Sequence, residues 1–175
     1  EAMAISPEKL DAGLVCFYLF NIVHLKEGEG IFQDAGIPHA YLRGQNVELM
    51  ACSDNVIRGG LTPKYVDIVE LLKIVDCHEV IPQIISAAPQ NQSEFTYKTP
   101  VNDFALAQIR VEPEQHTKVN LQSAGILLVM QGDLKIQEKS TALTLKQGES
   151  AFITADSNVE IMSEKGGYAF LAKLP

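Results

Sequence analysis

Short runs of apolar, β-prone residues alternate along this chain with polar and glycine-rich turns. In the last part of the sequence these runs are separated by turns such as "QGD" and "KGG". Runs of this length between turn residues are typical of strands. The pattern predicts strands within residues 95–174 at "FALAQIRV", "AGILLVMQG", "DLKIQE", "TALTLKQ", "SAFITA", "VEIMSE" and "YAFLAKL". Many short strands with frequent turns favour a sandwich or barrel.

The first 90 residues show two further patterns. Residues 13–60 hold four β-prone runs, "GLVCFYLFNIVHL", "GEGIFQ", "HAYLRG" and "VELMACS", and the length of the first also suits a buried helix. Residues 63–90 have helical spacing, with Pro63 as the opener and apolar residues at Val66, Val69, Leu72 and Ile74 or Val75. After Pro82 the sequence predicts a polar linker.

A short motif occurs twice, and its two copies lie 120 residues apart. The pattern L-K-x-G-E stands at 25–29 and 145–149, and each copy is followed by a phenylalanine and an alanine, which are Phe32, Ala35, Phe152 and Ala155. It suits a strand, a turn whose glycine takes positive φ, and a second strand. The motif resembles a hairpin of the cupin barrels, which leads in the first copy to His39 and in the second to Val159. Duplication of a barrel and chance repetition of a common turn are both compatible with it.

Composition and charge narrow the class of protein. The 175 residues fit one domain, or one domain and part of another, and a hydrophobic content of 46% suffices for a packed core. A net charge of −8 makes nucleic acid and anionic membrane surfaces poor partners. No apolar run has transmembrane length and no signal peptide is evident. Three widely spaced cysteines without a CxxC motif suggest reduced, mostly buried thiols and a cytoplasmic protein.

Residues 38–64 concentrate the ionisable chemistry of the chain. His39 follows Pro38 at the start of a predicted strand and points the same way as Tyr41, as a metal-ligating histidine would on entering a barrel. One histidine does not make a metal site, and the other ligands must come from elsewhere. The remaining histidines, His24, His78 and His116, have no partner at ligand spacing and are interpreted as ordinary core or surface residues.

Glu48 lies between Val47 and Leu49 in the predicted strand "NVELMAC". Both faces of that strand are apolar, so the strand is expected to be covered on both sides. A buried carboxylate costs desolvation energy unless it is paired or takes part in proton transfer. Proton transfer and a structural ion pair with Arg43 or Arg58 remain equal alternatives.

The segment "SDNVIRGGLTPK" combines a polar turn with two cations. Asp54 lies in a turn rich in side-chain hydrogen bonders, and glycines at 59 and 60 let the backbone pass close to a neighbour. Arg58 and Lys64 make a local cationic spot in an acidic chain, which suits a small anion such as a phosphate ester. A solvated loop with incidental charges is the alternative.

The whole stretch from His39 to Lys64 resembles a long signature of the type I mannose-6-phosphate isomerases. It reads H-A-Y-L-x-G-x-x-V-E-x-M-A-x-S-D-N-x-I-R-G-G-x-T-P-K, and it departs from the family only at Gly59, where the family has alanine. The flanking "LKEGEGIFQDAGIPHAYL", "TPVNDFALAQIRV" and "ILLVMQGDLKI" resemble the family as well, so the resemblance covers essentially the whole chain.

This resemblance implies a function and a set of roles. The family interconverts mannose 6-phosphate and fructose 6-phosphate through an enediol on a Zn²⁺-dependent cupin scaffold. By resemblance, His39 is a zinc ligand and Arg58 the active-site arginine. Glu48 is a candidate proton carrier or partner of the metal shell. Lys64, Tyr41 and Asp54 are expected at the sugar phosphate.

The family's first signature, Y-x-D-x-N-H-K-P-E, and its Gln-x-His ligand pair are missing from this sequence. We therefore expect the C-terminal portion of such an isomerase, which by itself binds zinc weakly or not at all and is inactive. The expected fold is mainly β, with cupin-like double-stranded β-helix (jelly-roll) barrels. Residues 1–62 would complete a catalytic barrel, 63–92 a helical connection, and 93–175 a second barrel. We also expect that the chain can form a dimer. The alternative function is a non-catalytic cupin module that binds sugar or protein.

Overall fold

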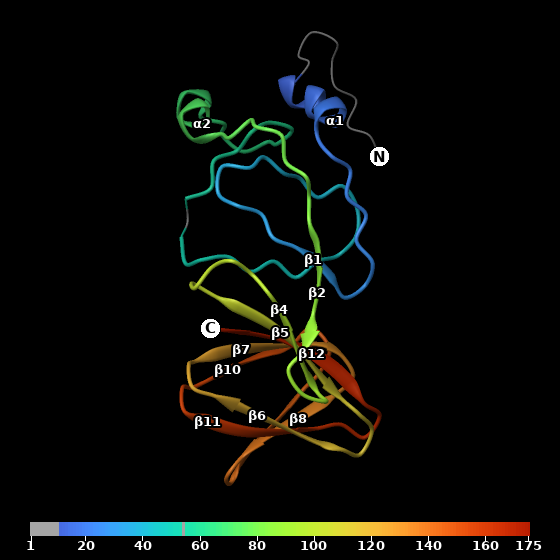
Figure 1. The fold of residues 1–175 in the computed structure, drawn as a ribbon. Coiled ribbons are helices and arrows are strands. Elements are labelled where there is room, and N and C mark those ends of the chain that lie inside the picture. Colours follow the sequence, from blue (N-terminus) through green and yellow to red (C-terminus); the bar gives the residue numbers. More distant parts are fainter. Residues whose placement is uncertain (1–10, 54) are drawn as a thin grey trace. The chain divides into compact units, whose positions relative to one another are not determined.

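The computed structural model of the chain describes residues 11–53 and 55–175 (Figure 1). The chain divides into two compact units. The first unit comprises the described parts of Glu1–Lys26, Ile31–Asn46 and Cys52–Ile84. The second, called the sandwich unit below, comprises Glu27–Gly30, Val47–Ala51 and Ile85–Pro175. A short two-stranded sheet pairs β1 (Glu29–Ile31) with β2 (Ile84–Ser86).

The described part of the first unit contains three short helices. They are a 3-10 helix, η1 (Ala12–Val15), followed directly by α1 (Cys16–Leu19), and then α2 (Ile68–Ile74). The run "GLVCFYLFNIVHL" is therefore helical at its start, and not the predicted strand. The alternative of a buried helix is also wrong, because Phe17, Tyr18 and Leu19 are exposed.

The strands predicted at "HAYLRG" and "VELMACS" are absent from the described residues, which run there as irregular chain. Their residue types favour strands, but β-propensity mainly reports how well a side chain fits a half-buried pleated surface. Neither segment pairs with a strand in the part of the chain that the structure describes. Without such pairing, the residue types alone do not produce a strand.

Helix α2 is much shorter than the helical spacing of residues 63–90 predicts. It begins after Asp67, whose carboxylate accepts the backbone N–H of Glu70, and not at Pro63. An aspartate that caps a helix with a glutamate three residues later is a common helix-start signal, which explains the position. The helix ends at Ile74, because the next residue, Val75, has an extended backbone. The predicted polar linker contains β2 and the short strand β3 (Ala88–Pro89).

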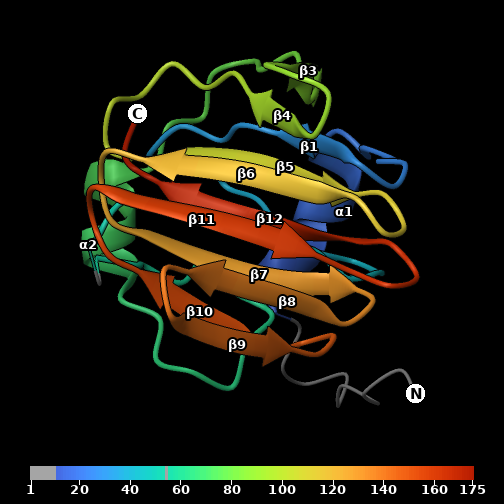
Figure 2. The same ribbon diagram turned by 90° about the horizontal axis from the view of Figure 1, so that it is seen from below.

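The sandwich unit consists of two stacked antiparallel sheets. The first has six strands in the order β10-β7-β12-β5-β4-β3 and the second has four in the order β6-β11-β8-β9. Their bounds are β4 (Glu94–Tyr97), β5 (Ala105–Val111), β6 (His116–Leu121), β7 (Gly125–Gln131), β8 (Leu134–Glu138), β9 (Thr141–Leu145), β10 (Ser150–Ile153), β11 (Ser157–Met162) and β12 (Gly167–Lys173). Figure 2 looks onto the stack, with β6, β11 and β8 lying across β5, β12 and β7. The prediction of a mainly β fold is confirmed.

Alternation of side chains places the core between the two sheets. In β12 the inward residues Ala169 and Leu171 are fully buried, and in β6 every second residue from Thr117 is buried. The core is built from alternating positions of both sheets: Ala107, Ile109, Val111, Val119, Leu121, Leu127, Val129, Leu134, Ile136, Leu145, Ile153, Val159, Ile161, Ala169 and Leu171. The seven strands predicted within residues 95–174 are confirmed, and β4 and β6 were not foreseen.

The two copies of the L-K-x-G-E motif form the same kind of turn. Gly28 has φ +81° and Gly148 has φ +84°, as the motif predicts for its glycine. Val159, the counterpart of His39, is a core residue with 5% exposure. The second copy thus offers no polar side chain at that place. Within the described residues, no helix has the length and apolar character needed to cross a membrane.

Candidate functional site

Asp11 organises the loop that carries the predicted active-site arginine. Its Oδ1 accepts the N–H of Gly13 at 2.8 Å, and its Oδ2 accepts the N–H of Leu61 at 2.9 Å. Gly60 has φ +137°, and a Cβ there would lie 2.8 Å from Asp11 Oδ1, so a side chain would be both strained and obstructed. Gly59, where the resembling family has alanine, has an ordinary φ and open space around it. That departure therefore leaves the loop geometry unchanged.

His39 is exposed at the start of the same loop-rich stretch, and one ring nitrogen is already used. Its Nδ1 lies 2.9 Å from the carbonyl oxygen of Ile37. A carbonyl can only accept a hydrogen bond, so Nδ1 carries the hydrogen in the neutral ring and Nε2 keeps its lone pair. Metal-ligating histidines are commonly oriented by such a bond at the second nitrogen. The hydrogen bond to Ile37 therefore leaves Nε2, one of the two nitrogens through which a histidine can bind zinc, available on His39.

Three further predicted site residues of the first unit, Tyr41, Arg58 and Lys64, have exposed side chains. The ring of Tyr41 lies edge-on to that of His39, with 6.1 Å between centroids. Arg58 and Lys64 are exposed, and neither forms an ion pair with another residue of the described ranges. Cations without an internal carboxylate partner are suited to an external anion.

Glu48 does not have the environment that the sequence predicts. Its segment is not a strand, the side chain is exposed, and Val47–Ala51 is grouped with the sandwich unit. The desolvation that motivated both interpretations of Glu48 is therefore missing, and its predicted burial is wrong. Asp54, the remaining predicted substrate contact, lies outside the described residues.

The described residues do not contain a complete metal site. Within residues 11–53 and 55–175, no group of three or more His, Cys, Asp and Glu side chains is placed to hold an ion. Zinc in proteins takes three or four such ligands. His39 supplies one suitable nitrogen, so the residues present fit a zinc ion only as one contributor to its shell.

The histidines interpreted as ordinary residues include two that form local pairs. The Nδ1 of His78 pairs with the carboxylate of Asp76, and this hydrogen bond lowers the pKa of Asp76. His116 Nδ1 lies 3.2 Å from Glu160 on the neighbouring strand β11. The three cysteines are free thiols; Cys52 and Cys77 are exposed and Cys16 is half-buried, so their predicted burial is wrong.

Two tyrosines of the sandwich unit hold the first L-K-x-G-E turn. Tyr97, only 6% exposed, donates its hydroxyl to the carbonyl of Gly28 at 2.8 Å. Tyr168 donates to Glu27 at 3.2 Å. Burial raises the pKa of Tyr97, and burial together with the bond to Glu27 raises that of Tyr168. Both hydroxyls are therefore kept protonated as donors to the turn.

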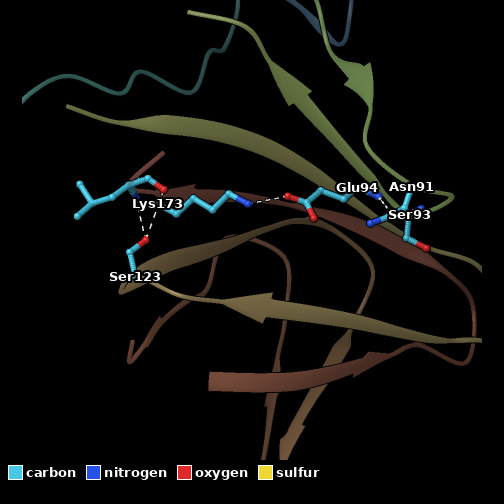
Figure 3. A network of polar contacts seen from close by, with 6 residues as sticks. Asn91, Ser93, Glu94, Ser123 and Lys173 are labelled. Atoms are coloured by element: carbon cyan, nitrogen blue, oxygen red, sulfur yellow. Dashed lines mark hydrogen bonds and ion pairs between the residues drawn. The ribbon is translucent and has the colours of Figure 1, made fainter. Parts of the chain in front are cut away.

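A polar network inside the sandwich unit was not predicted from the sequence. Lys173 Nζ lies 2.7 Å from Glu94 Oε1, and Ser123 binds the backbone of Leu174 next to that lysine (Figure 3). Asn91 accepts the N–H of Ser93 and of Glu94, which fixes the start of β4. The signal was present in "YAFLAK", because Lys173 continues the inward positions of Ala169 and Leu171.

Comparison with known proteins connects these features to a family. Residues 93–165 match the mannose-6-phosphate isomerase cupin domain. Mannose-6-phosphate isomerase from Escherichia coli is 43% identical over 150 residues, which cover 85% of this chain and 38% of that protein. The human enzyme is 35% identical over 159 residues, again covering 38% of its length. The chain thus spans well under half the length of these relatives.

Solved structures give the same relation. A crystal structure of a phosphomannose isomerase variant from Salmonella typhimurium has a TM-score of 0.79 and 37% identity, covering 94% of this chain and 43% of that one. The mannose 6-phosphate isomerase from the same organism, bound to fructose 6-phosphate and zinc, has a TM-score of 0.60 and 35% identity over 71% of this chain and 32% of that one. The chain is therefore related, over most of its own length, to the mannose-6-phosphate isomerases, and residues 93–165 of the sandwich unit correspond to their cupin domain.

Proposed function

We propose that this chain supplies part of the active site of an enzyme that interconverts mannose 6-phosphate and fructose 6-phosphate. The observation that carries the proposal is His39, whose hydrogen bond to Ile37 leaves Nε2 available as a metal ligand within a stretch that resembles the family signature. A related Salmonella isomerase was crystallised with fructose 6-phosphate and zinc, which supports the same substrate and metal.

The reaction sets the requirements for the residues. A base removes the proton from C2 of mannose 6-phosphate, an enediol forms, and a proton is delivered to C1 to give the ketose. Negative charge develops on the oxygens of the enediol, and a fixed cation stabilises it. Arg58, exposed and without an ion pair to the described residues, is our candidate for this role. Lys64 is the candidate for the phosphate, where a point charge suffices.

Three further residues have weaker structural support. Tyr41 lies beside His39 and is proposed at the substrate hydroxyls. Glu48 stays a candidate proton carrier only by resemblance, because its side chain is exposed. Asp54 keeps its predicted contact with substrate from the sequence alone.

The proposed enzyme uses zinc, but the described residues supply only part of the zinc site. When bound, zinc would polarise the oxygens on which charge develops. The described residues contribute His39 and no group of three ligands, so the ion needs donors beyond them. We therefore expect the 175-residue chain alone to bind zinc weakly and to form no fructose 6-phosphate from mannose 6-phosphate.

A chimera tests the proposed function directly. The part of the Escherichia coli isomerase that this chain matches would be replaced by the chain, and fructose 6-phosphate formation would be measured with added zinc. The proposal predicts an active chimera and an inactive isolated chain. An isolated chain that turns over as fast as the intact relative would refute the shared site.

Cellular location, assembly and the alternative function also remain proposals. Free thiols at Cys16, Cys52 and Cys77 suit a reducing compartment, and we place the protein in the cytoplasm. Dimerisation is proposed from the exposed apolar side chains of the first unit, and sedimentation of the purified chain tests it. A folded chimera that binds the sugar phosphate without turnover would favour the non-catalytic sugar-binding module.

A further inference from the structure

An ion pair occupies a place on the inner face of the six-stranded sheet where apolar side chains are expected. Glu94 on β4 and Lys173 on β12 reach towards each other across the strand between them, β5 (Figure 3). Their side chains are only 18% and 22% exposed, and 2.7 Å separates Nζ from Oε1. The pair is therefore largely removed from water.

Small residues make room for this pair. In the sheet register, Lys173 lies opposite Ala105, and Thr96 lies opposite Ala107. Ala105 and Ala107 are the inward residues of β5 at this end, and the next inward residue, Ile109, lies opposite Glu94. Two consecutive inward alanines leave a shallow space over β5, and the two long side chains extend across it.

The second sheet leaves part of this face uncovered. The four-stranded sheet lies across β10, β7, β12 and β5, so β4 and β3 extend beyond it (Figure 2). A cavity of about 530 Å³ opens here. Its walls include Glu94, Lys173, Lys98, Thr96, Gln90, Asn102 and Phe104. The volume falls within the range of small-molecule sites, roughly 300–1,000 Å³.

Stability alone is a weak reason for a buried ion pair at this position. Desolvation of both charges offsets much of their attraction, and an apolar pair of similar volume often stabilises a fold as well or better. A role in binding a ligand is the better explanation, because the two charges line a cavity. A carboxylate and an ammonium side by side offer acceptor and donor to the same ligand.

We propose that this cavity binds a small neutral polyhydroxylated molecule of monosaccharide size. Glu94 and Lys173 together carry no net charge, so an ionic ligand would be attracted by one member and repelled by the other. Lys98, the third charged side chain of the walls, is exposed, so water screens its charge. Two vicinal hydroxyls satisfy both members, since one donates to Glu94 and the other accepts from Lys173. Thr96, Gln90 and Asn102 provide further polar contacts, and Phe104 an apolar surface. The site lies wholly in the sandwich unit and does not depend on the proposed isomerase function.

Nuclear magnetic resonance of the isotope-labelled chain tests the site. D-mannose and myo-inositol, both neutral and without phosphate, would be titrated with no zinc present. We expect saturable shifts of the backbone amides of residues 90–105 and 171–174, and none in residues 38–64. Absence of saturable shifts, or shifts confined to other parts of the chain, would overturn the proposal.

Two kinds of variant separate binding from folding. Asn102→Ala leaves the ion pair intact and should weaken binding about 10-fold, as expected for one lost hydrogen bond. The double variant Glu94→Met with Lys173→Met removes both charges together, and should fold but show no saturable shifts. Lys73→Met is the matched control, because its pair with Glu70 is also 2.7 Å long but more than 45% exposed on both sides. If the double variant binds as tightly as the parent, the pair is only structural and the proposal is overturned. If the double variant does not fold, the residues whose amides shift in the parent decide whether the ligand binds in this cavity.

Discussion

Leu171 should be among the side chains that contribute most to the stability of the sandwich unit. It is fully buried on β12, between Ala107 of β5 and Leu127 of β7 in the register, and packs close to Gly125. Truncation to alanine removes three carbons, worth about 2.4 kcal/mol in transfer free energy, and leaves a cavity that adds to the loss. We expect Leu171→Ala to lower the free energy of unfolding by about 3–4 kcal/mol.

Leu174→Ala is the matched control for this prediction. Leu174 lies three residues further along the chain and is 56% exposed. Its hydrogen bonds with the Ser123 hydroxyl use only the backbone atoms of Leu174. The same truncation there should cost less than about 1 kcal/mol. Urea unfolding would be followed by circular dichroism and by tyrosine fluorescence, since the chain has no tryptophan. Equal losses for the two variants would contradict the position of the core between the sheets.

The remaining predictions concern ionisation, capping and backbone conformation. Burial raises the pKa of Tyr97 above its ordinary 10.0. The stability that the protonated hydroxyl contributes is therefore complete below pH 10.0 and is lost as the pH rises through the raised pKa. Tyr97→Phe should make the fall of Tm at alkaline pH smaller. Asp67→Ala should destabilise α2 by about 1 kcal/mol, seen as faster amide exchange of Glu70 and Leu71. Gly60→Ala should cost about 1–3 kcal/mol in thermal unfolding while Gly59→Ala is neutral, and the reverse order would contradict the loop geometry.

Strand positions were predictable where an apolar run of residues packs against the other sheet of the sandwich unit. In β7 and β12 an apolar run between turn residues predicted each strand, and one face of each is buried against the other sheet. Strand β6 was missed because its inward residues include the polar Thr117, although every second position is buried. "HAYLRG" and "VELMACS" failed for the opposite reason, since suitable residues pair with no strand in the described part of the chain.

The residues of the candidate site remain a prediction from the sequence, and the structure shows the environment of those it describes. The resemblance predicts His39 as a zinc ligand, and the structure adds the hydrogen bond that selects its tautomer. The burial of Glu48 was inferred from apolar neighbours in sequence, which does not decide what covers a loop. The spacing in "YAFLAK" indicates the inward position of Lys173, but its partner Glu94 lies on a strand far away in sequence, so spacing alone could not reveal the pair.

The central claim is that Arg58 stabilises the charge that develops during isomerisation. It is tested most directly by the kcat of the chimera with the Escherichia coli enzyme, carrying Arg58→Ala or Arg43→Ala. Both arginines are exposed in the same stretch, so Arg43 controls for the loss of a surface charge. We predict that Arg58→Ala lowers kcat for mannose 6-phosphate by about 100-fold or more, while Arg43→Ala leaves it nearly unchanged. An Arg58→Ala chimera as active as its parent would contradict the account.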